Sequence, residues 1–246
     1  VSVPTQSILF NIDIEGPLTK DKTAVLRVFA KMFYNHCGFY GDDLKIAKLE
    51  RFIEKQGKTQ QFREAFEKVN GAPWTETRDS FAFFEDDIVS VLQSTLGMSE
   101  QAARNWFNGE ETNELSIAQL VADIQEYVDG KGKDFRLLFM VDEVGQYIGD
   151  DGDLMINLQS LVEEIGIRCH GKVWVMVTSQ EAIDSVVHIT GNDFSKIQGR
   201  FNTRLSLSSS SVDEVIKKRV LAKTDAADQL LRMVYDKEHA VLKNLY

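Results

Sequence analysis

Two adjacent carboxylates, Asp142 and Glu143, follow an unbroken apolar run at residues 137–141. Continuous apolar residues are typical of a parallel strand that is covered on both faces, and ligands of open α/β sheets bind just beyond the carboxyl ends of such strands. The pattern is that of a Walker B strand in a P-loop ATPase. There the Asp holds a nucleotide-bound Mg²⁺, usually through water, and the Glu orients the attacking water. The alternative is a core strand followed by an acidic, solvated turn.

A second strand is predicted at residues 173–177, after a helix whose apolar residues recur at helical spacing over 154–165. Strand, helix and strand in this order form a βαβ unit, and neither strand alternates, so a parallel sheet is expected. The second strand ends in Thr178 and Ser179. A hydroxyl at this place is expected to act as a sensor that hydrogen-bonds the γ-phosphate or the attacking water. A plain helix N-cap is the alternative.

Two arginines, Arg200 and Arg204, lie four residues apart, before a short strand-like segment at 205–207 and a helical pattern at 212–221. At a subunit boundary an arginine can reach the γ-phosphate of a neighbour's nucleotide and stabilise charge in the transition state. Either residue is therefore a candidate arginine finger. The alternative is a pair of surface arginines in solvated ion pairs.

The sequence contains no G-x-x-x-x-G-K-[ST] motif, the loop whose backbone N–H groups cradle phosphates. The segment Gly57-Lys58-Thr59 comes nearest, but the first glycine of the motif is absent and the segment lies between predicted helices. We expect the phosphate loop to precede Val1. The apolar segment at 7–14 then becomes a strand of the same sheet, and Asp13 or Glu15 at its tip could face the site.

A metal site of a nuclease or a calcium loop is a competing interpretation of the acidic residues after the first predicted strand. These are Asp142, Glu143, Asp150, Asp151 and Asp153. Their spacing does not match the calcium-loop template D-x-[DN]-x-[DN]-G, and no catalytic lysine follows at a familiar distance. The four histidines and two cysteines show no metal-ligand spacing. The sequence therefore favours the nucleotide interpretation.

Composition restricts the class of protein. The chain has 246 residues, 43% of them hydrophobic, and a formal net charge of −10. These values suit a globular domain and argue against a generally basic nucleic-acid surface. Residues 21–128 are almost wholly helical in pattern. No apolar run approaches the roughly 18 residues that span a bilayer, so we expect a soluble, cytoplasmic protein without membrane contact.

Longer stretches of the sequence resemble one family. DEVGQYIGD at 142–150, VTSQ at 177–180 and NDFSKIQGRF at 192–201 closely resemble the BrxC family, the large P-loop ATPases of bacterial BREX phage-defence systems. The resemblance extends through nearly the whole chain, including the region of Trp74 and Trp106. The long stretches are far more specific than a bare Walker B pattern.

This resemblance implies a bacterial cytoplasmic ATPase of the AAA+-like class that uses ATP and Mg²⁺. It implies other BREX components as partners, which methylate host DNA and block phage DNA replication, and a homo-oligomer that hydrolyses ATP between subunits. The site residues would take these roles: Asp142 organises Mg²⁺, Glu143 is the catalytic base, Thr178 or Ser179 is the sensor, and Arg200 is the arginine finger, with Arg204 as the second candidate. The absent phosphate loop is the departure from the family pattern.

The predicted fold is an α/β P-loop NTPase of the AAA+-like kind: a three-layer parallel sheet with a large helical insertion, truncated at both ends. Residues 1–20 and 131–210 would form the incomplete ATPase core, 21–130 the helical insertion and 211–246 the start of a helical lid. The intact parent is expected to hydrolyse ATP to drive a step on DNA or partner proteins, and this piece is expected to be inactive alone. The alternative is a non-hydrolysing scaffold on the same fold.

Overall fold

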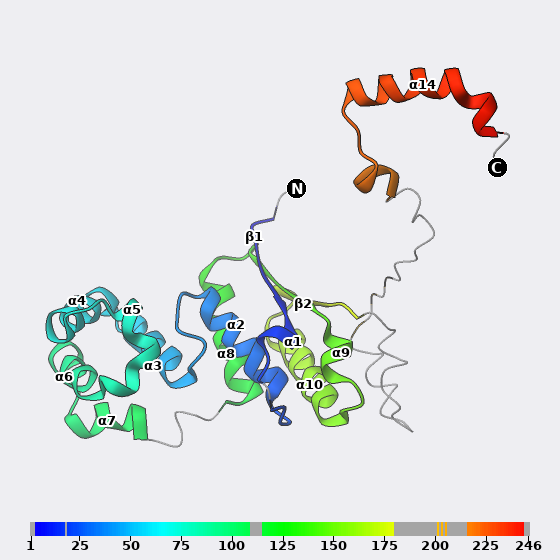
Figure 1. Cartoon of the computed structure of the whole chain (residues 1–246). Helices are drawn as coiled ribbons and strands as arrows, with labels where there is room; N and C mark the ends of the chain where they lie inside the picture. Colours follow the sequence, from blue (N-terminus) through cyan, green and yellow to red (C-terminus); the bar gives the residue numbers. More distant parts are fainter. Residues whose placement is uncertain are drawn as a thin grey trace. The chain divides into compact units, whose positions relative to one another are not determined.

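The computed structural model describes residues 3–17, 19–108, 115–179, 201, 203, 205 and 216–243. The chain divides into two compact units, Val1–Arg200 and Phe201–Tyr246, and each is described by itself. The first unit holds the sheet and most of the described helices (Figure 1).

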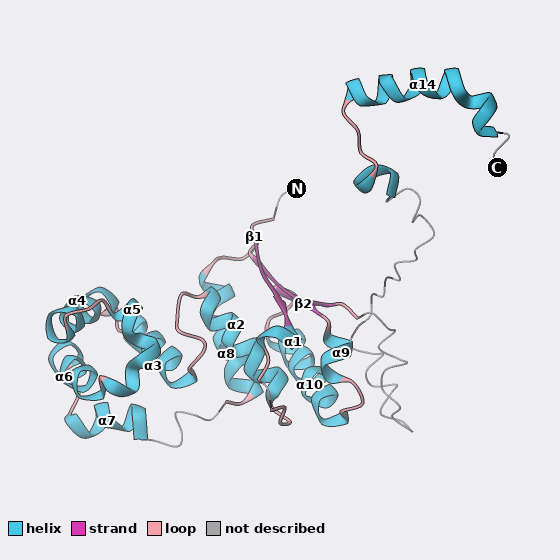
Figure 2. Ribbon diagram, viewed as in Figure 1, coloured by secondary structure: helices cyan, strands magenta, loops and turns pink. Residues whose placement is uncertain are grey.

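Three parallel strands form the sheet (Figure 2): β1 (Thr5–Asn11), β2 (Arg136–Asp142) and β3 (Val173–Val177), with β2 in the middle. Asn11 of β1 pairs with Asp142 of β2, and Val141 of β2 pairs with Val177 of β3. Because parallel strands run in the same direction, all three carboxyl ends lie at one edge of the sheet.

The first strand confirms the expectation of a strand near residues 7–14 in the same sheet. It ends at Asn11, and the short helix α1 (Ile12–Glu15) follows at once. The Asn11 side-chain oxygen accepts hydrogen bonds from the backbone N–H groups of Asp13 (2.9 Å) and Ile14 (3.2 Å). An Asn at this position satisfies free donors of the first helical turn, which explains why the strand stops here.

A layer of helices packs on one face of the sheet: α2 (Ala24–His36), α8 (Ile117–Gly130) and α10 (Gly152–Arg168). Helix α2 contacts β1, α10 contacts β3, and α8 packs against both helices. The ring of Phe29 in α2 contacts one ring from each of two strands. Centroid to centroid, it is 5.5 Å from Phe10 of β1 and 5.3 Å from Phe139 of β2. This contact anchors the helix layer to the sheet.

The opposite face of the sheet is open in the part of the chain that the structure describes. Leu9, Trp174 and Met176 point to this face and are 70%, 60% and 50% exposed. The predicted three-layer sheet is therefore wrong, since the described residues form a small parallel sheet with helices on one face, in a mostly helical chain. The apolar run of β2 suggested two covered faces because Leu138 and Met140 are apolar although they are only partly buried. The parallel sheet is compatible with an α/β class.

Helices between α2 and α8 form a helical lobe, defined here as residues 44–108. They are α3 (Leu44–Lys55), α4 (Thr59–Asn70), α5 (Trp74–Thr77), the 3₁₀ helix η1 (Arg78–Phe83), α6 (Glu85–Leu96) and α7 (Glu100–Asn108). Their apolar side chains pack into one cluster, in which the Trp74 ring makes edge contacts with Phe62 (5.3 Å) and Phe66 (5.0 Å). The lobe thus has its own hydrophobic core, whereas α2 and α8, which also lie within 21–130, belong to the helix layer of the sheet.

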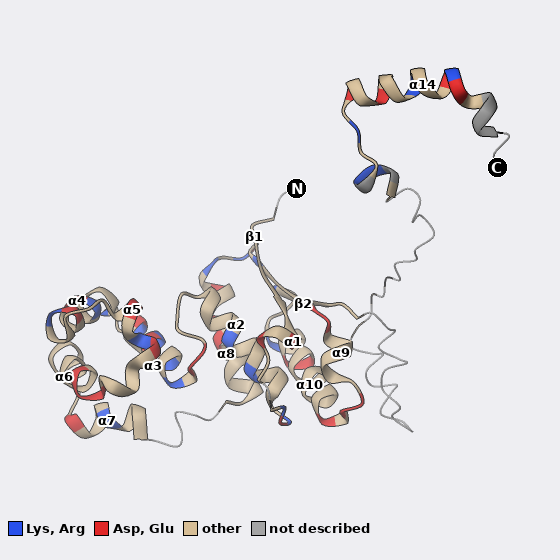
Figure 3. Cartoon of the chain, viewed as in Figure 1, with Lys and Arg blue, Asp and Glu red and all other residues tan. Residues whose placement is uncertain are grey.

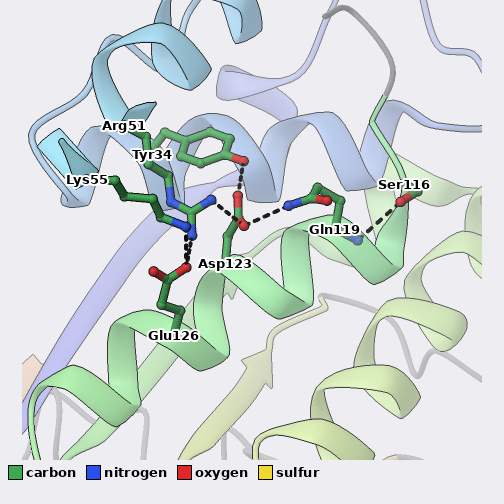
Figure 4. A network of polar contacts seen from close by, with 7 residues as sticks. All are labelled: Tyr34, Arg51, Lys55, Ser116, Gln119, Asp123 and Glu126. Carbon is green, nitrogen blue, oxygen red and sulfur yellow. Dashed lines mark hydrogen bonds and ion pairs between the residues drawn. The ribbon is translucent and has the colours of Figure 1, made fainter. Parts of the chain in front are cut away.

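A polar network joins the lobe to the helix layer (Figure 4). Asp123 of α8 is only 4% exposed. It accepts hydrogen bonds from the Tyr34 hydroxyl (2.8 Å) and from Gln119 Nε2 (2.9 Å), and it forms an ion pair with Arg51 of α3. Arg51 also contacts Glu126 at 2.5 Å. Burial, together with the Asp123 charge, raises the pKa of Tyr34, so its hydroxyl stays a donor.

The second unit contains a π-helical segment (Ile216–Val220) and the helix α14 (Asp225–Lys243). Figure 3 shows acidic and basic residues distributed along α14. None of the helices in the described ranges is long and apolar enough to cross a membrane.

Replacement of Asp123 by Ala is expected to lower the free energy of unfolding by about 1–3 kcal/mol, because the buried Tyr34 hydroxyl loses its acceptor and Arg51 keeps only the more exposed Glu126 as a partner. Urea denaturation followed by circular dichroism measures the change. The control is Glu164→Gln, which removes half of a more exposed pair with Arg168 and is expected to cost about 0–1 kcal/mol. Equal effects of the two substitutions would contradict the anchoring role of Asp123.

Candidate functional site

Polar side chains from all three strands meet at the carboxyl edge of the sheet. Asn11 is the last residue of β1, and Asp142 is the last residue of β2. Glu143 directly follows β2, and Thr178 directly follows β3. The Thr178 backbone N–H donates to the Val141 carbonyl at 2.9 Å, which continues the ladder one residue beyond β3. The structure therefore brings together three of the residues singled out in the sequence, Asp142, Glu143 and Thr178.

Hydrogen bonds run through these side chains from one outer strand to the other. Asn11 Nδ2 donates to Glu143 Oε2 at 2.6 Å, and the Thr178 hydroxyl donates to Asp142 Oδ1. The Glu143 backbone N–H lies 3.1 Å from Asp142 Oδ1 and 3.2 Å from Thr178 Oγ1. Both carboxylates are thus oriented by residues of the neighbouring strands.

Among the described residues, the edge is acidic and partly exposed. Asp142 and Thr178 are exposed, and Asn11 and Glu143 are partly buried. Figure 3 shows acidic residues where the chain passes from β2 to the next helix, α9 (Val144–Ile148). A carboxylate has two oxygens that together accept about four hydrogen bonds, so the bonds from Asn11 and Thr178 leave capacity for a ligand or for water.

The backbone of Glu143 is left-handed, with φ 60° and ψ 28°. A residue with a side chain costs roughly 1–2 kcal/mol in this conformation. Among the described non-glycine residues, only Glu143 and His170 have positive φ. Backbone strain of this kind is concentrated at functional sites, so the conformation supports a role for the Glu143 side chain.

The other predicted site residues are Ser179, Arg200 and Arg204. Ser179 follows Thr178, and its buried hydroxyl oxygen has no hydrogen-bond partner within the described residues. Arg200 and Arg204 lie outside the described residues. The arginine finger therefore stays a prediction.

The competing metal site is not formed by the part of the chain that is described, where no group of three or more His, Cys, Asp and Glu side chains could hold an ion. Asp151 instead caps α10, accepting from the backbone N–H groups of Asp153 (3.0 Å) and Leu154 (3.1 Å). A Mg²⁺ site needs fewer protein ligands, because the ion keeps several waters and binds one or two carboxylates together with substrate phosphates. Asp142 at the strand tip fits that requirement.

The segment Gly57-Lys58-Thr59 connects α3 and α4 within the lobe. It does not follow a strand, which confirms that it lies between two helices.

The residue at the tip of β1 was not predicted. The sequence offered Asp13 or Glu15 as residues that could face the site, but they form ion pairs with Lys20 (3.8 Å) and Lys31 (2.8 Å). Asn11 takes the place instead. An Asn before a helical turn is an N-cap signal, and it could have marked both the end of the strand and the residue at its tip.

Neither the comparison with models of known protein families nor the comparison with solved structures found a match for this chain.

Replacement of Thr178 by Val is expected to lower the free energy of unfolding by about 1 kcal/mol, because the bonds of its hydroxyl to Asp142 and to the Glu143 N–H are lost. Thr178→Ser keeps the hydroxyl and is the matched control. Urea denaturation of the two variants measures the difference. A Val variant as stable as the Ser variant would show that these contacts do not hold the edge together.

Proposed function

We propose that this chain forms the acidic edge of a Mg²⁺-nucleotide site in an ATPase of the bacterial BREX type. The observation that carries the proposal is the meeting of Asn11, Asp142, Glu143 and Thr178 at the carboxyl ends of three parallel strands. Ligands of open α/β sheets bind at that edge. The resemblance of residues 142–150 to the BrxC family adds independent support.

Asp142 is the residue proposed to organise Mg²⁺ through water, because it is exposed and is the last residue of the central strand. Glu143 is proposed to orient and polarise the attacking water. Asn11 limits the movement of that carboxylate by bonding one of its oxygens. Thr178 is the proposed sensor, since its hydroxyl contacts the Asp142 carboxylate and the Glu143 backbone N–H.

The contacts to the phosphates are proposed to come from elsewhere in the parent protein, because a site of carboxylates alone repels them. A phosphate loop outside this sequence would supply one set. Arg200, or Arg204 as the second candidate, would act as an arginine finger toward the nucleotide of a neighbouring copy in a homo-oligomer. Other BREX components, and DNA through them or through the parent, are the proposed partners in the bacterial cytoplasm.

A non-hydrolysing scaffold is the second candidate. It is favoured by the absence of a phosphate-loop motif from the sequence and by the bonds that Asn11 and Thr178 already make to the two acids. In this case the edge would stabilise the sheet, and the surface of the chain would bind partner proteins.

Glu143→Gln in the parent protein, with its phosphate loop present, is expected to reduce Mg²⁺-dependent ATP hydrolysis on the order of 10²-fold or more, because an amide cannot accept the proton of the attacking water. ATP binding is expected to persist, since Glu143 is not proposed to contact the phosphates. Phosphate release and nucleotide binding are measured on the same preparations.

The matched control is Asp150→Asn, which changes an exposed acid outside the proposed site and is expected to leave hydrolysis unchanged. Hydrolysis that is absent from the unmodified parent, with partners and DNA present, would favour the scaffold. Equal loss in both variants would contradict the assignment of Glu143 as the base.

A further inference from the structure

Two short helices begin at the central hydrogen bond of the site. Asn11 is the N-cap of α1, and Glu143 is the N-cap of α9. The side chains of these two caps meet in the 2.6 Å bond from Asn11 Nδ2 to Glu143 Oε2. The pairing of Asn11 with Asp142 brings Asn11 and Glu143 together, and the length of the bond also depends on how α1 and α9 lie against each other.

One side chain, Lys20, contacts both helices away from that bond. Its Nζ donates to the backbone carbonyl of Tyr147 in the last turn of α9 (2.8 Å) and lies 3.9 Å from the centre of the Tyr147 ring. The same Nζ is 3.8 Å from Asp13 Oδ1 in α1. A cation near a helix C-terminus and over an aromatic ring is favourable on both counts.

The two helices have little room to shift, because glycine is required where they approach. Gly16 follows α1, and a Cβ atom at this position would lie 2.6 Å from Tyr147 Cε2 and 2.8 Å from the Ile12 carbonyl oxygen. The first contact is between the two helices, whereas the second lies within α1 and its cap. The close approach of Gly16 to Tyr147 and the Lys20 contacts both restrict how α1 and α9 lie against each other.

We propose that Lys20 is a positioning residue for Glu143: by joining α1 to α9 it holds the Glu143 carboxylate at the distance where Asn11 can bond it. Lys20 touches neither reacting group nor nucleotide in this proposal. Its effect on hydrolysis rests on the proposed function, whereas its effect on the Asn11–Glu143 bond does not.

The first test measures the bond itself in this chain, by the NMR signal of the Asn11 side-chain amide. A hydrogen bond to a carboxylate is shorter and stronger than a neutral one, so its loss is expected to move the signal of the bonded amide proton. Glu143→Gly, which suits a positive φ, gives the reference position of the Asn11 signal without this bond. Lys20→Met keeps the aliphatic stem and removes the charge, and it is expected to move the signal most of the way to that reference. Lys20→Arg is expected to keep the signal near its original position.

Lys22→Met, at an exposed lysine of the same segment, is the control and is expected to leave the Asn11 signal in place. The backbone amide signals of each variant show whether the chain remains folded. An Asn11 signal that is unchanged in a folded Lys20→Met chain would overturn the proposal.

The second test uses the parent protein. Lys20→Met is expected to lower kcat for ATP hydrolysis on the order of 10-fold, because a misplaced base loses rate, while KM for ATP stays within about twofold. Lys20→Arg is expected to restore the rate. If the parent does not hydrolyse ATP, the proposed function is refuted. The NMR result alone then decides whether Lys20 positions Glu143. A raised KM with unchanged kcat would contradict positioning.

Discussion

The parallel pairing of the three strands is the constraint on which the candidate site depends. Asn11 and Glu143 are 132 positions apart in the chain, and the ladder through β2 brings them within one hydrogen bond. A slip of one residue would turn Asn11 to the other face of the sheet. The ladder is supported in turn by the ring of Phe29, which contacts both Phe10 and Phe139. The packing of the core therefore also supports the geometry of the candidate site.

The helical lobe depends on two different kinds of interaction. Its interior is stabilised by burial of apolar side chains around Trp74, which has no strong directional preference. Its attachment through Arg51 and Asp123 is a charged contact that works only in one geometry. Such buried pairs add little net stability compared with apolar packing, but they can select one arrangement of two elements. The network in Figure 4 suits that role.

Local sequence patterns predicted where the helices and strands lie better than they predicted which residues of these elements are buried. The apolar runs located all three strands, and helical spacing predicted that residues 21–128 are mostly helical, because side-chain periodicity is a property of the local backbone. The parallel direction followed from the strand, helix and strand order. The open face could not be predicted, since the exposure of Leu9 and Met176 depends on which distant segments pack there. Asn11 was missed for a similar reason: its bond to Glu143 exists only after the strands pair.

At Glu143 the left-handed backbone lowers the thermal stability of the fold, while the side chain is the one that the proposed reaction needs. Glycine adopts this conformation without steric cost, and asparagine tolerates it better than glutamate does. Selection for heat resistance alone would therefore favour replacing the very side chain that the proposed site needs, since strained residues at functional positions oppose activity to stability. A stabilised variant of this chain that carries a substitution at Glu143 would be a well-folded protein from which the proposed base has been removed.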